Sequence, residues 1–316
     1  MKKLMAIVVA GISLYQVPVV LAGPVNVTGD VSVKYERDTE DGIAANSGMI
    51  YSTKIMGEMD FGAGWSGYAR LGAQHLTQSG LGDFNPERYG EDRKSVLALD
   101  QFGVKYKMGN LEYKLGRQDV TVGTTALLYS RPDSNVGKNY FVDGLTVAGT
   151  VGIMDVSAVI AQEDNVGGAD NKVYALRAGY SPRENFNFGL TLGRYLDPST
   201  ENTNHLAVDG TYKFGKNSLT VELAKSSSHV DNKAYAATLN RNITDKTAVY
   251  ITGFKVETNG DMGKQSDFDN DNQGFHYGIT HSLSANNNLE VVYSDQKTIS
   301  GGVHNNKLEA TLSHGF

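Results

Sequence analysis

Charged side chains recur in this sequence at positions that only a folded chain would bring together. Basic residues share one parity of the alternating segments in the first third of the chain, and carboxylates follow in a long irregular stretch. The basic set is Lys34, Lys54, Arg70 and Lys105, with Arg117 at the entrance of the irregular stretch, and the acidic set is Asp119, Asp133 and Asp143. Such groups facing each other across a narrow wet gap would create a transverse field that orients dipolar solutes and slows apolar ones.

For Arg117, the alternation pattern alone does not decide which face of the strand the side chain occupies. It shares its parity with Tyr113 and Leu115, which are typical of an apolar face. A bulge would be needed to turn the Arg117 side chain toward the basic set.

Patterns typical of an enzyme or of a metal site are not found in the sequence. It has no Cys, its seven His are scattered, and it contains no zinc-protease motif, nucleophile elbow or glycine-rich phosphate loop. Residues 267–272 have an acidic spacing similar to that of a calcium loop, but the Gly and the terminal Glu at fixed offsets are missing. We therefore expect no enzymatic activity and no cofactor, and interpret residues 267–272 as a solvated loop, with calcium binding as the alternative.

Strict alternation of apolar and polar residues identifies the elements that position these groups. At the end of the chain, Leu308, Ala310, Leu312 and Phe316 alternate with polar or small residues, which is typical of a strand with one apolar face. The same pattern recurs sixteen times from residue 25 onward, at about 18 residues per strand and connection. It predicts an all-β fold, a 16-stranded antiparallel transmembrane barrel that Phe316 closes against the first strand, and a barrel of this size holds a water channel.

The connections between these segments alternate between short turns and longer loops, which is typical of barrels in outer membranes. The longest irregular stretch, residues 119–142, follows the fifth strand and carries the apolar groups Leu127-Leu128-Tyr129 and Tyr140-Phe141. A loop that long is usually functional. We expect residues 119–142 to fold inward between strands five and six, to pack on the barrel wall and to constrict the lumen.

The N-terminus is typical of a secretory signal peptide. Lys2 and Lys3 precede a largely apolar segment, and the small residues before position 23 predict cleavage after Ala22. Residues 1–22 are thus a signal peptide and 23–316 form one barrel domain, whose formal net charge changes from −6 to −8 on cleavage. No later run of about 18 apolar residues could form a transmembrane helix, and no basic patch indicates nucleic-acid binding.

Taken together, the chain resembles the general (non-specific) porins of Gram-negative bacteria over its whole mature length. The resemblance rests on the signal peptide, the strand number, the segment Leu115-Gly116-Arg117-Gln118 and the ending Ser313-His314-Gly315-Phe316. It implies a homotrimer in the outer membrane of a diderm bacterium, in contact with membrane lipid. It also implies that residues 119–142 form the constriction, that small hydrophilic solutes and ions diffuse through, and that the barrel-assembly machinery reads Phe316. The loop lacks the Pro-Glu-Phe-Gly-Gly pattern of the enterobacterial members.

Three functions remain open on sequence grounds. The favoured one is a porin for passive diffusion, with a weak cation preference suggested by the net charge. A channel selective for sugars, phosphate or carboxylates is an alternative, although only Tyr68 and Tyr195 are clear inward aromatics and the lumen charges are mixed in sign. A structural or adhesive outer-membrane barrel is the other alternative, which would need longer outer loops.

Overall fold

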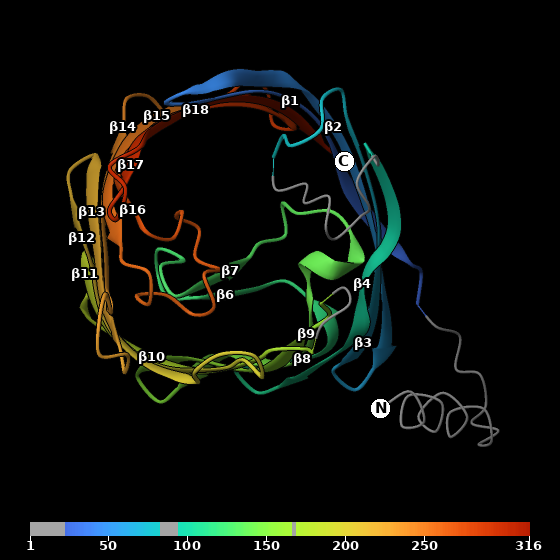
Figure 1. The fold of residues 1–316 in the computed structure, drawn as a ribbon. Helices are drawn as coiled ribbons and strands as arrows, with labels where there is room; N and C mark the ends of the chain where they lie inside the picture. Colours follow the sequence, from blue (N-terminus) through green and yellow to red (C-terminus); the bar gives the residue numbers. More distant parts are fainter. Residues whose placement is uncertain (1–22, 83–93, 166–168) are drawn as a thin grey trace.

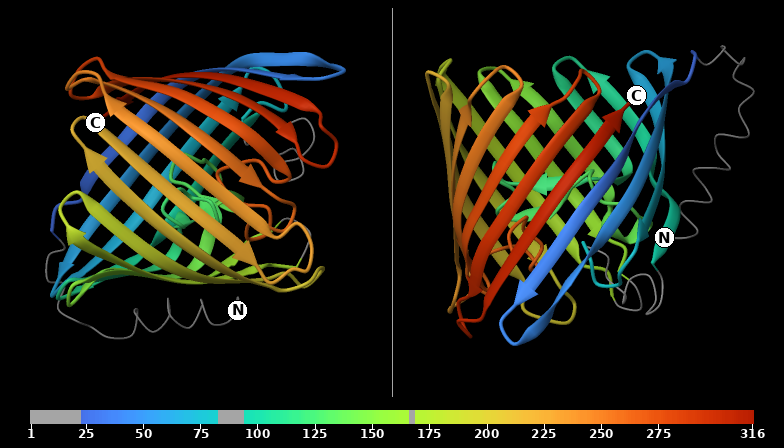
Figure 2. Two further views of the ribbon diagram at one scale, coloured as in Figure 1. Left: turned by 90° about the vertical axis from the view of Figure 1, so that its left-hand side faces the viewer. Right: turned by 90° about the horizontal axis from the view of Figure 1, so that it is seen from above.

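Sixteen antiparallel strands form a closed barrel, as the alternation predicts. The structure is a computed structural model, which describes residues 23–82, 94–165 and 169–316, so the predicted signal peptide lies outside the described residues. Each strand pairs with its neighbour along the chain, and the last strand, β18, pairs with β1. The strands are tilted to the barrel axis, and the wall is continuous around the ring (Figure 2).

The barrel strands have the following bounds: β1 Asn26–Glu40, β2 Ile43–Gly62, β3 Trp65–Leu76, β4 Ser95–Met108, β5 Leu111–Gln118, β8 Val142–Val151, β9 Met154–Glu163 and β10 Lys172–Arg183. The second half comprises β11 Phe186–Leu196, β12 Thr203–Phe214, β13 Asn217–Ser226, β14 Lys233–Asn242, β15 Thr247–Val256, β16 Asn272–Ser282, β17 Asn287–Thr298 and β18 His304–Gly315. Three short elements lie in the connection from β5 to β8, namely β6 Val120–Val122, β7 Tyr129–Arg131 and the 3-10 helix η1 Lys138–Tyr140.

The outer face of the wall is apolar because every second strand residue is aliphatic or aromatic. Exposed examples are Leu115, Leu176, Leu190, Leu223 and Leu312. A lipid bilayer solvates such a face, while the strands satisfy their backbone groups by pairing around the ring. Within the described residues, no helix has the length and apolarity needed to cross a membrane.

The two ends of the chain meet in the wall. β1 and β18 are paired from Asp30 with Gly315 to Glu40 with Asn305. Phe316 extends this ladder, because its N–H donates to the Gly29 carbonyl and its own carbonyl accepts from the Gly29 N–H, both at 2.9 Å. A Cβ at position 29 would approach the Phe316 ring to 2.8 Å, so glycine is required for this contact.

Two connections lie inside the ring of strands. Figure 1, viewed down the barrel, shows the segment with β6, β7 and η1 (teal to green) crossing the interior, and the connection from β15 to β16 (orange) meeting it. The first is the predicted inward loop, here called the inner loop (residues 119–141). The second, residues 257–271, is here called the second inner loop; it contains most of residues 267–272, and its inward path was not predicted from the sequence.

Candidate functional site

Arg70 holds the middle of the inner loop against the wall. Its guanidinium pairs with Asp100 at 2.8 and 3.0 Å, and donates to Asp133 Oδ1 at 2.7 Å and to the Asn135 carbonyl at 2.8 Å. Arg70 and Asp100 are almost fully buried, whereas Asp133 is largely exposed. Arg70 and Asp133, which the sequence places at the constriction, therefore meet, and Arg70 lies beneath the loop as its anchor.

A β-bulge in β4 makes this anchor possible. Arg70 pairs with Gln101 and Leu71 with Leu99, so Asp100 is the extra residue. Asp100 and Gln101 thus both reach the interior side, where Gln101 Nε2 donates to Asp133 Oδ1 at 2.8 Å. Sequence reasoning missed Asp100, because the alternation rule assigns consecutive residues to opposite faces.

Polar contacts also hold the beginning of the inner loop. Lys114 Nζ pairs with Asp119 at 2.8 Å. The N–H and Oγ1 of Thr125 donate to the buried Glu222 carboxylate on β13 at 2.7 and 2.8 Å. Gly123, with φ +98°, lies against the same carboxylate, which a Cβ at this position would approach to 2.3 Å. The loop is therefore held at both ends of its path across the barrel.

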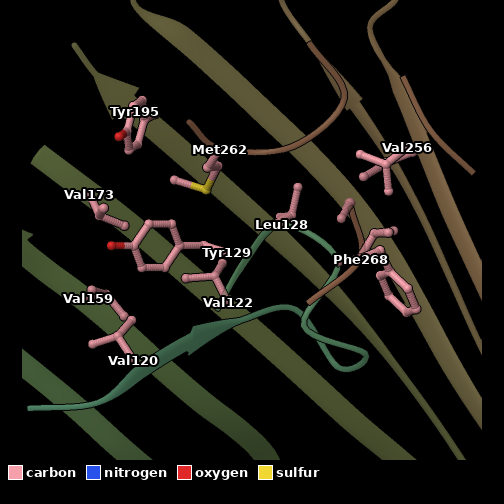
Figure 3. Close-up of a cluster of buried hydrophobic side chains, with 14 of the residues drawn as sticks. Val120, Val122, Leu128, Tyr129, Val159, Val173, Tyr195, Val256, Met262 and Phe268 are labelled. Carbon is pink, nitrogen blue, oxygen red and sulfur yellow. The ribbon is translucent and has the colours of Figure 1, made fainter. Parts of the chain in front are cut away.

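An apolar seat supports the inner loop on the opposite side of the barrel. Val120, Val122, Leu127, Leu128 and Tyr129 of the loop are buried against small and aliphatic residues of the wall, and Figure 3 shows this cluster. The wall residues are Val159, Ala161, Val173, Tyr195, Ala207, Ala224, Ala234, Ala236, Phe254 and Val256. The predicted packing of Leu127-Leu128-Tyr129 on the wall is confirmed. On β15, the inner residues Phe254 and Val256 belong to this seat.

The second inner loop binds the inner loop through its backbone. The Met262 N–H donates to the Leu128 carbonyl at 2.8 Å, the Asp267 N–H to the Ala126 carbonyl at 3.0 Å, and the Ser130 N–H to the Gln265 carbonyl at 2.5 Å. Met262 and Phe268 are buried in the apolar seat. These two apolar residues within an acidic stretch were the sequence signal for inward folding.

A buried carboxylate holds the second inner loop in shape. Asp261 accepts from the Ser266 N–H at 3.0 Å and from Asn270 Nδ2 at 2.7 Å. Burial raises the pKa of Asp261 above its usual value, and these hydrogen bonds oppose that rise. The hydrogen-bonding capacity of the Asp261 carboxylate is thus used within the second inner loop. Within the described residues, no three acidic or histidine side chains gather as a metal site, and this includes residues 267–272.

Two cavities lie beside the loops, and the first faces the wall formed by β1, β2, β17 and β18. One cavity of about 250 Å³ lies between residues 134–136 of the inner loop and wall residues that include Lys34, Glu290 and Glu309. A second cavity of about 290 Å³ lies between the two inner loops, where Lys264, Asp267 and Asp269 contribute. Both cavities are lined by Asn135 and Tyr140, so they adjoin at the inner loop.

The remaining predicted wall cations face the interior and are paired. Lys34 Nζ lies 2.9 Å from Glu36 and also pairs with Glu309. Lys54 pairs with Asp30 at 3.0 Å and donates to the Asp133 carbonyl at 3.3 Å. Lys105 pairs with Glu58 at 2.7 Å. Cations and acids therefore alternate along the wall, in place of a purely basic wall facing an acidic loop.

Arg117 and Asp143 lie on the outer face of the barrel. β4, β5 and β8 pair without a register shift around Arg117, which keeps it on the face of Leu115. Arg117 pairs with Asp143 at 2.6 Å and with Asp164 at 2.8 Å, and its guanidinium lies 5.9 Å from the Phe102 ring. Arg117 and Asp143 were expected to face the lumen. In this register both face outward, because no bulge turns the strand.

Solved structures of porins resemble the described fold. A variant of the porin from Rh. blastica with three substitutions matches with a TM-score of 0.60 and 11% sequence identity, covering 93% of this chain and 100% of that chain. A triple mutant of Rhodopseudomonas blastica porin gives 0.59 and 10% identity over the same shares. A structure described as "Asymmetric conductivity of engineered proteins" gives 0.60 and 11%, again covering 93% and 100%. No protein-family model and no curated protein matches the sequence. The chain has the fold of these 16-stranded porins.

Proposed function

We propose that the protein is an outer-membrane porin through which small hydrophilic solutes and ions diffuse passively. The observation that carries this proposal is the cavity between residues 134–136 and the inner faces of β1, β2, β17 and β18, which we interpret as part of a passage through the barrel. Its lining is mixed in charge, and the inner loop beside it is fixed by a buried ion pair and an apolar seat. A fixed, wet and narrow passage is what diffusion through a barrel requires.

The passage would sort solutes by size and polarity. Lys34, Glu290 and Glu309 line it from the wall, and the exposed Asp133 lies nearby on the loop. Charges of both signs across a narrow gap orient water and dipolar solutes, so an apolar solute must displace ordered water to pass. No step of this mechanism consumes energy or needs a cofactor.

A selective sugar channel has less support. The two inward aromatics that could begin an aromatic ladder, Tyr68 and Tyr195, are both buried in the described structure. Tyr68 lies beneath the ammonium groups of Lys105 and Lys114, and Tyr195 lies in the apolar seat. Neither ring offers a face along which a sugar could slide.

An adhesive barrel also has less support, because two of the longest connections fold inward. The inner loop and the second inner loop are committed to the lumen by burial of Leu127, Leu128 and Met262. These two segments are therefore not available to a partner outside the barrel.

We propose a homotrimer whose contact surface includes the outer face of β5, β8 and β9. Arg117, Asp143 and Asp164 form an ion-pair cluster on this face. A charged group in contact with lipid is destabilising, so cover by protein favours this cluster. The end-to-end contact of Phe316 with Gly29 supports a role for Phe316 in barrel closure and in recognition by the assembly machinery.

Single-channel recording in a planar bilayer under a salt gradient tests the proposed function. The refolded mature chain should give ohmic steps in multiples of three with mild ion selectivity. Current that saturates and is blocked by one solute class would instead indicate a selective channel. Absence of conductance would contradict the proposal.

A further inference from the structure

Two apolar grooves lie on the outer surface of the barrel, away from the lumen. The first has a volume of about 320 Å³ and is lined by Leu206, Val208, Leu223 and Tyr235, with Lys225 and Lys233 among its lining residues. The second, of about 550 Å³, adjoins it at Tyr235 and is lined by Phe275, Asp295 and Lys297 among others. Both grooves therefore combine an apolar body with lysine side chains, and the second also carries a carboxylate.

The strand register places all these cations at one end of the barrel. Lys225 is the penultimate residue of β13, and Lys233 is the first residue of β14. Lys297 and His304 are paired near the loop between β17 and β18. These positions adjoin the longer loops, whereas the apolar residues of the grooves lie further along the strands. The first groove is thus apolar along the wall and basic at its loop end.

Lys225 and Lys233 are directly paired across β13 and β14. Two like charges at such a position repel each other. Within residues 23–82, 94–165 and 169–316, neither lysine has an ion-pair partner, and both are exposed. The carboxylate of Glu257 on the same side pairs with Lys255 at 2.7 Å and accepts from the Lys233 N–H at 3.0 Å. The Glu257 carboxylate thus serves Lys233 and Lys255 together, so cations are in excess at this end of the groove.

The opposite side of the barrel has a different charge pattern at this level. On β5, β8 and β9, Arg117 is neutralised by Asp143 and Asp164, and Gln162 donates to Asp170. On β10, β11, β13, β14 and β17, the outward row near the loops instead has an excess of cations. It comprises Lys172, Arg194, Lys225, Lys233 and Lys297, with Asp295 as an acid beside Lys297. The two sides of the outer rim are therefore suited to different neighbours.

We propose that the first groove, here called the lysine-capped groove, binds a membrane lipid that carries an anionic phosphate headgroup. The phosphate lies between the ammonium groups of Lys225 and Lys233, and one acyl chain lies along Leu206, Val208 and Leu223. The phosphate removes the repulsion between the two lysines, and the acyl chain gains van der Waals contacts with the residues of the groove. The row of cations on the same side of the rim raises the local concentration of such lipids. This proposal does not depend on conduction through the lumen.

Spin-labelled lipids in nanodiscs test the proposal on the full mature protein. Nanodiscs of phosphatidylcholine contain a trace of either spin-labelled phosphatidic acid or spin-labelled phosphatidylcholine, and electron paramagnetic resonance measures the immobilised fraction of each label. We expect phosphatidic acid to be immobilised preferentially. Replacement of each of the two lysines by Gln should lower this preference about fivefold. The Lys225→Gln/Lys233→Gln variant should therefore show no preference for phosphatidic acid.

A matched control uses the same two hairpins at their other end. Lys216 and Lys246 lie in the turns after β12 and β14, so Lys216→Gln/Lys246→Gln removes equal charge. We expect this variant to keep the preference for phosphatidic acid. Equal loss in both double variants, or no preference in the unmodified protein, would overturn the site.

Two further arms separate the parts of the ligand. Val208→Trp fills the groove and should lower the immobilised fraction of phosphatidic acid while both lysines remain. Inorganic phosphate at constant ionic strength should not release the label, because it lacks a chain to occupy the groove. Release at millimolar phosphate, or no effect of Val208→Trp, would show a plain anion site and overturn the lipid proposal.

Discussion

The guanidinium of Arg70 and the carboxylate of Asp100 form a two-point pair with N–O distances of 2.8 and 3.0 Å, and both side chains are almost fully buried. The pair lies between the wall and the inner loop, where Asp100 Oδ2 also accepts from the Gly137 N–H at 3.0 Å. It joins a bulge in β4 to the loop beside the passage. The position of the inner loop beside the first cavity therefore depends on a buried ion pair.

Removal of one partner of this pair should release the inner loop. In Arg70→Met, the buried Asp100 loses its cation, which costs about 3–5 kcal/mol. We expect larger and noisier single-channel conductance with an intact barrel, which gel mobility of the folded form would verify. Arg241→Gln, at an exposed position on β14, is the control, and unchanged conductance in Arg70→Met would contradict the anchor role.

Bulk at two positions of the inner loop should have opposite effects. Ser134 lines the passage, so Ser134→Trp should lower conductance. Gly123 has φ +98° and lies against Glu222, so Gly123→Ala should strain the backbone by about 1–3 kcal/mol and lift the loop from the wall. We expect raised or noisier conductance in Gly123→Ala. The same direction of change in both variants would argue against the assigned path of the loop.

The stability of the second inner loop should depend on pH through Asp261. Burial raises the pKa of this carboxyl in the folded protein, so folding favours its protonated form. Its contribution to loop stability is therefore full at low pH and is lost as pH rises through the raised pKa. Hydrogen exchange of the Met262 and Asp267 amides should quicken over that window. Asp261→Asn should remove the dependence, and an unchanged pH profile in this variant would exclude Asp261 as its source.

The passage should prefer cations. Glu290, Glu309, Asp267 and Asp269 line the two adjoining cavities, against Lys34, Lys264 and a buried Arg131 that already pairs with Glu163. Glu290→Gln/Asp269→Asn should move the reversal potential in a potassium chloride gradient toward zero.

The matched control for the selectivity test is Glu184→Gln/Asp245→Asn. These acids lie in the short turns after β10 and β14, away from the cavities. The control should leave the reversal potential in place. An equal displacement in both variants would indicate a general charge effect in place of selection within the passage.

Assembly of subunits should require Arg117. In Arg117→Met, Asp143 and Asp164 lose their common partner on the outer face, where they repel each other. We expect a shift from trimer to monomer in mass measurements on the detergent-solubilised protein. Arg183→Met, at the end of β10, is the control and should stay trimeric. A trimeric Arg117→Met variant would place the subunit contact elsewhere.

The alternation of side chains was sufficient to predict the barrel. Outward residues such as Leu115, Leu176 and Leu312 recur with a period of two, and a barrel is the arrangement in which such strands leave no unpaired edge. The inward path of the inner loop was also predictable, because Leu127, Leu128 and Tyr129 are too apolar for solvent. The second inner loop was missed, since Met262 and Phe268 are separated by polar residues and their burial depends on a partner loop far away in sequence.

The sequence by itself determined the strands, their closure through Phe316 and the presence of a loop in the lumen, because these follow from local periodicity and from apolar groups that must be buried. Only the tertiary structure decided what individual charges do. Arg70 became an anchor because a bulge brings Asp100 to its side, and Arg117 became an outer-surface residue because no bulge turns its strand. A one-residue change in register reverses the face of a side chain, and registers are set by pairing with strands that the local sequence does not contain.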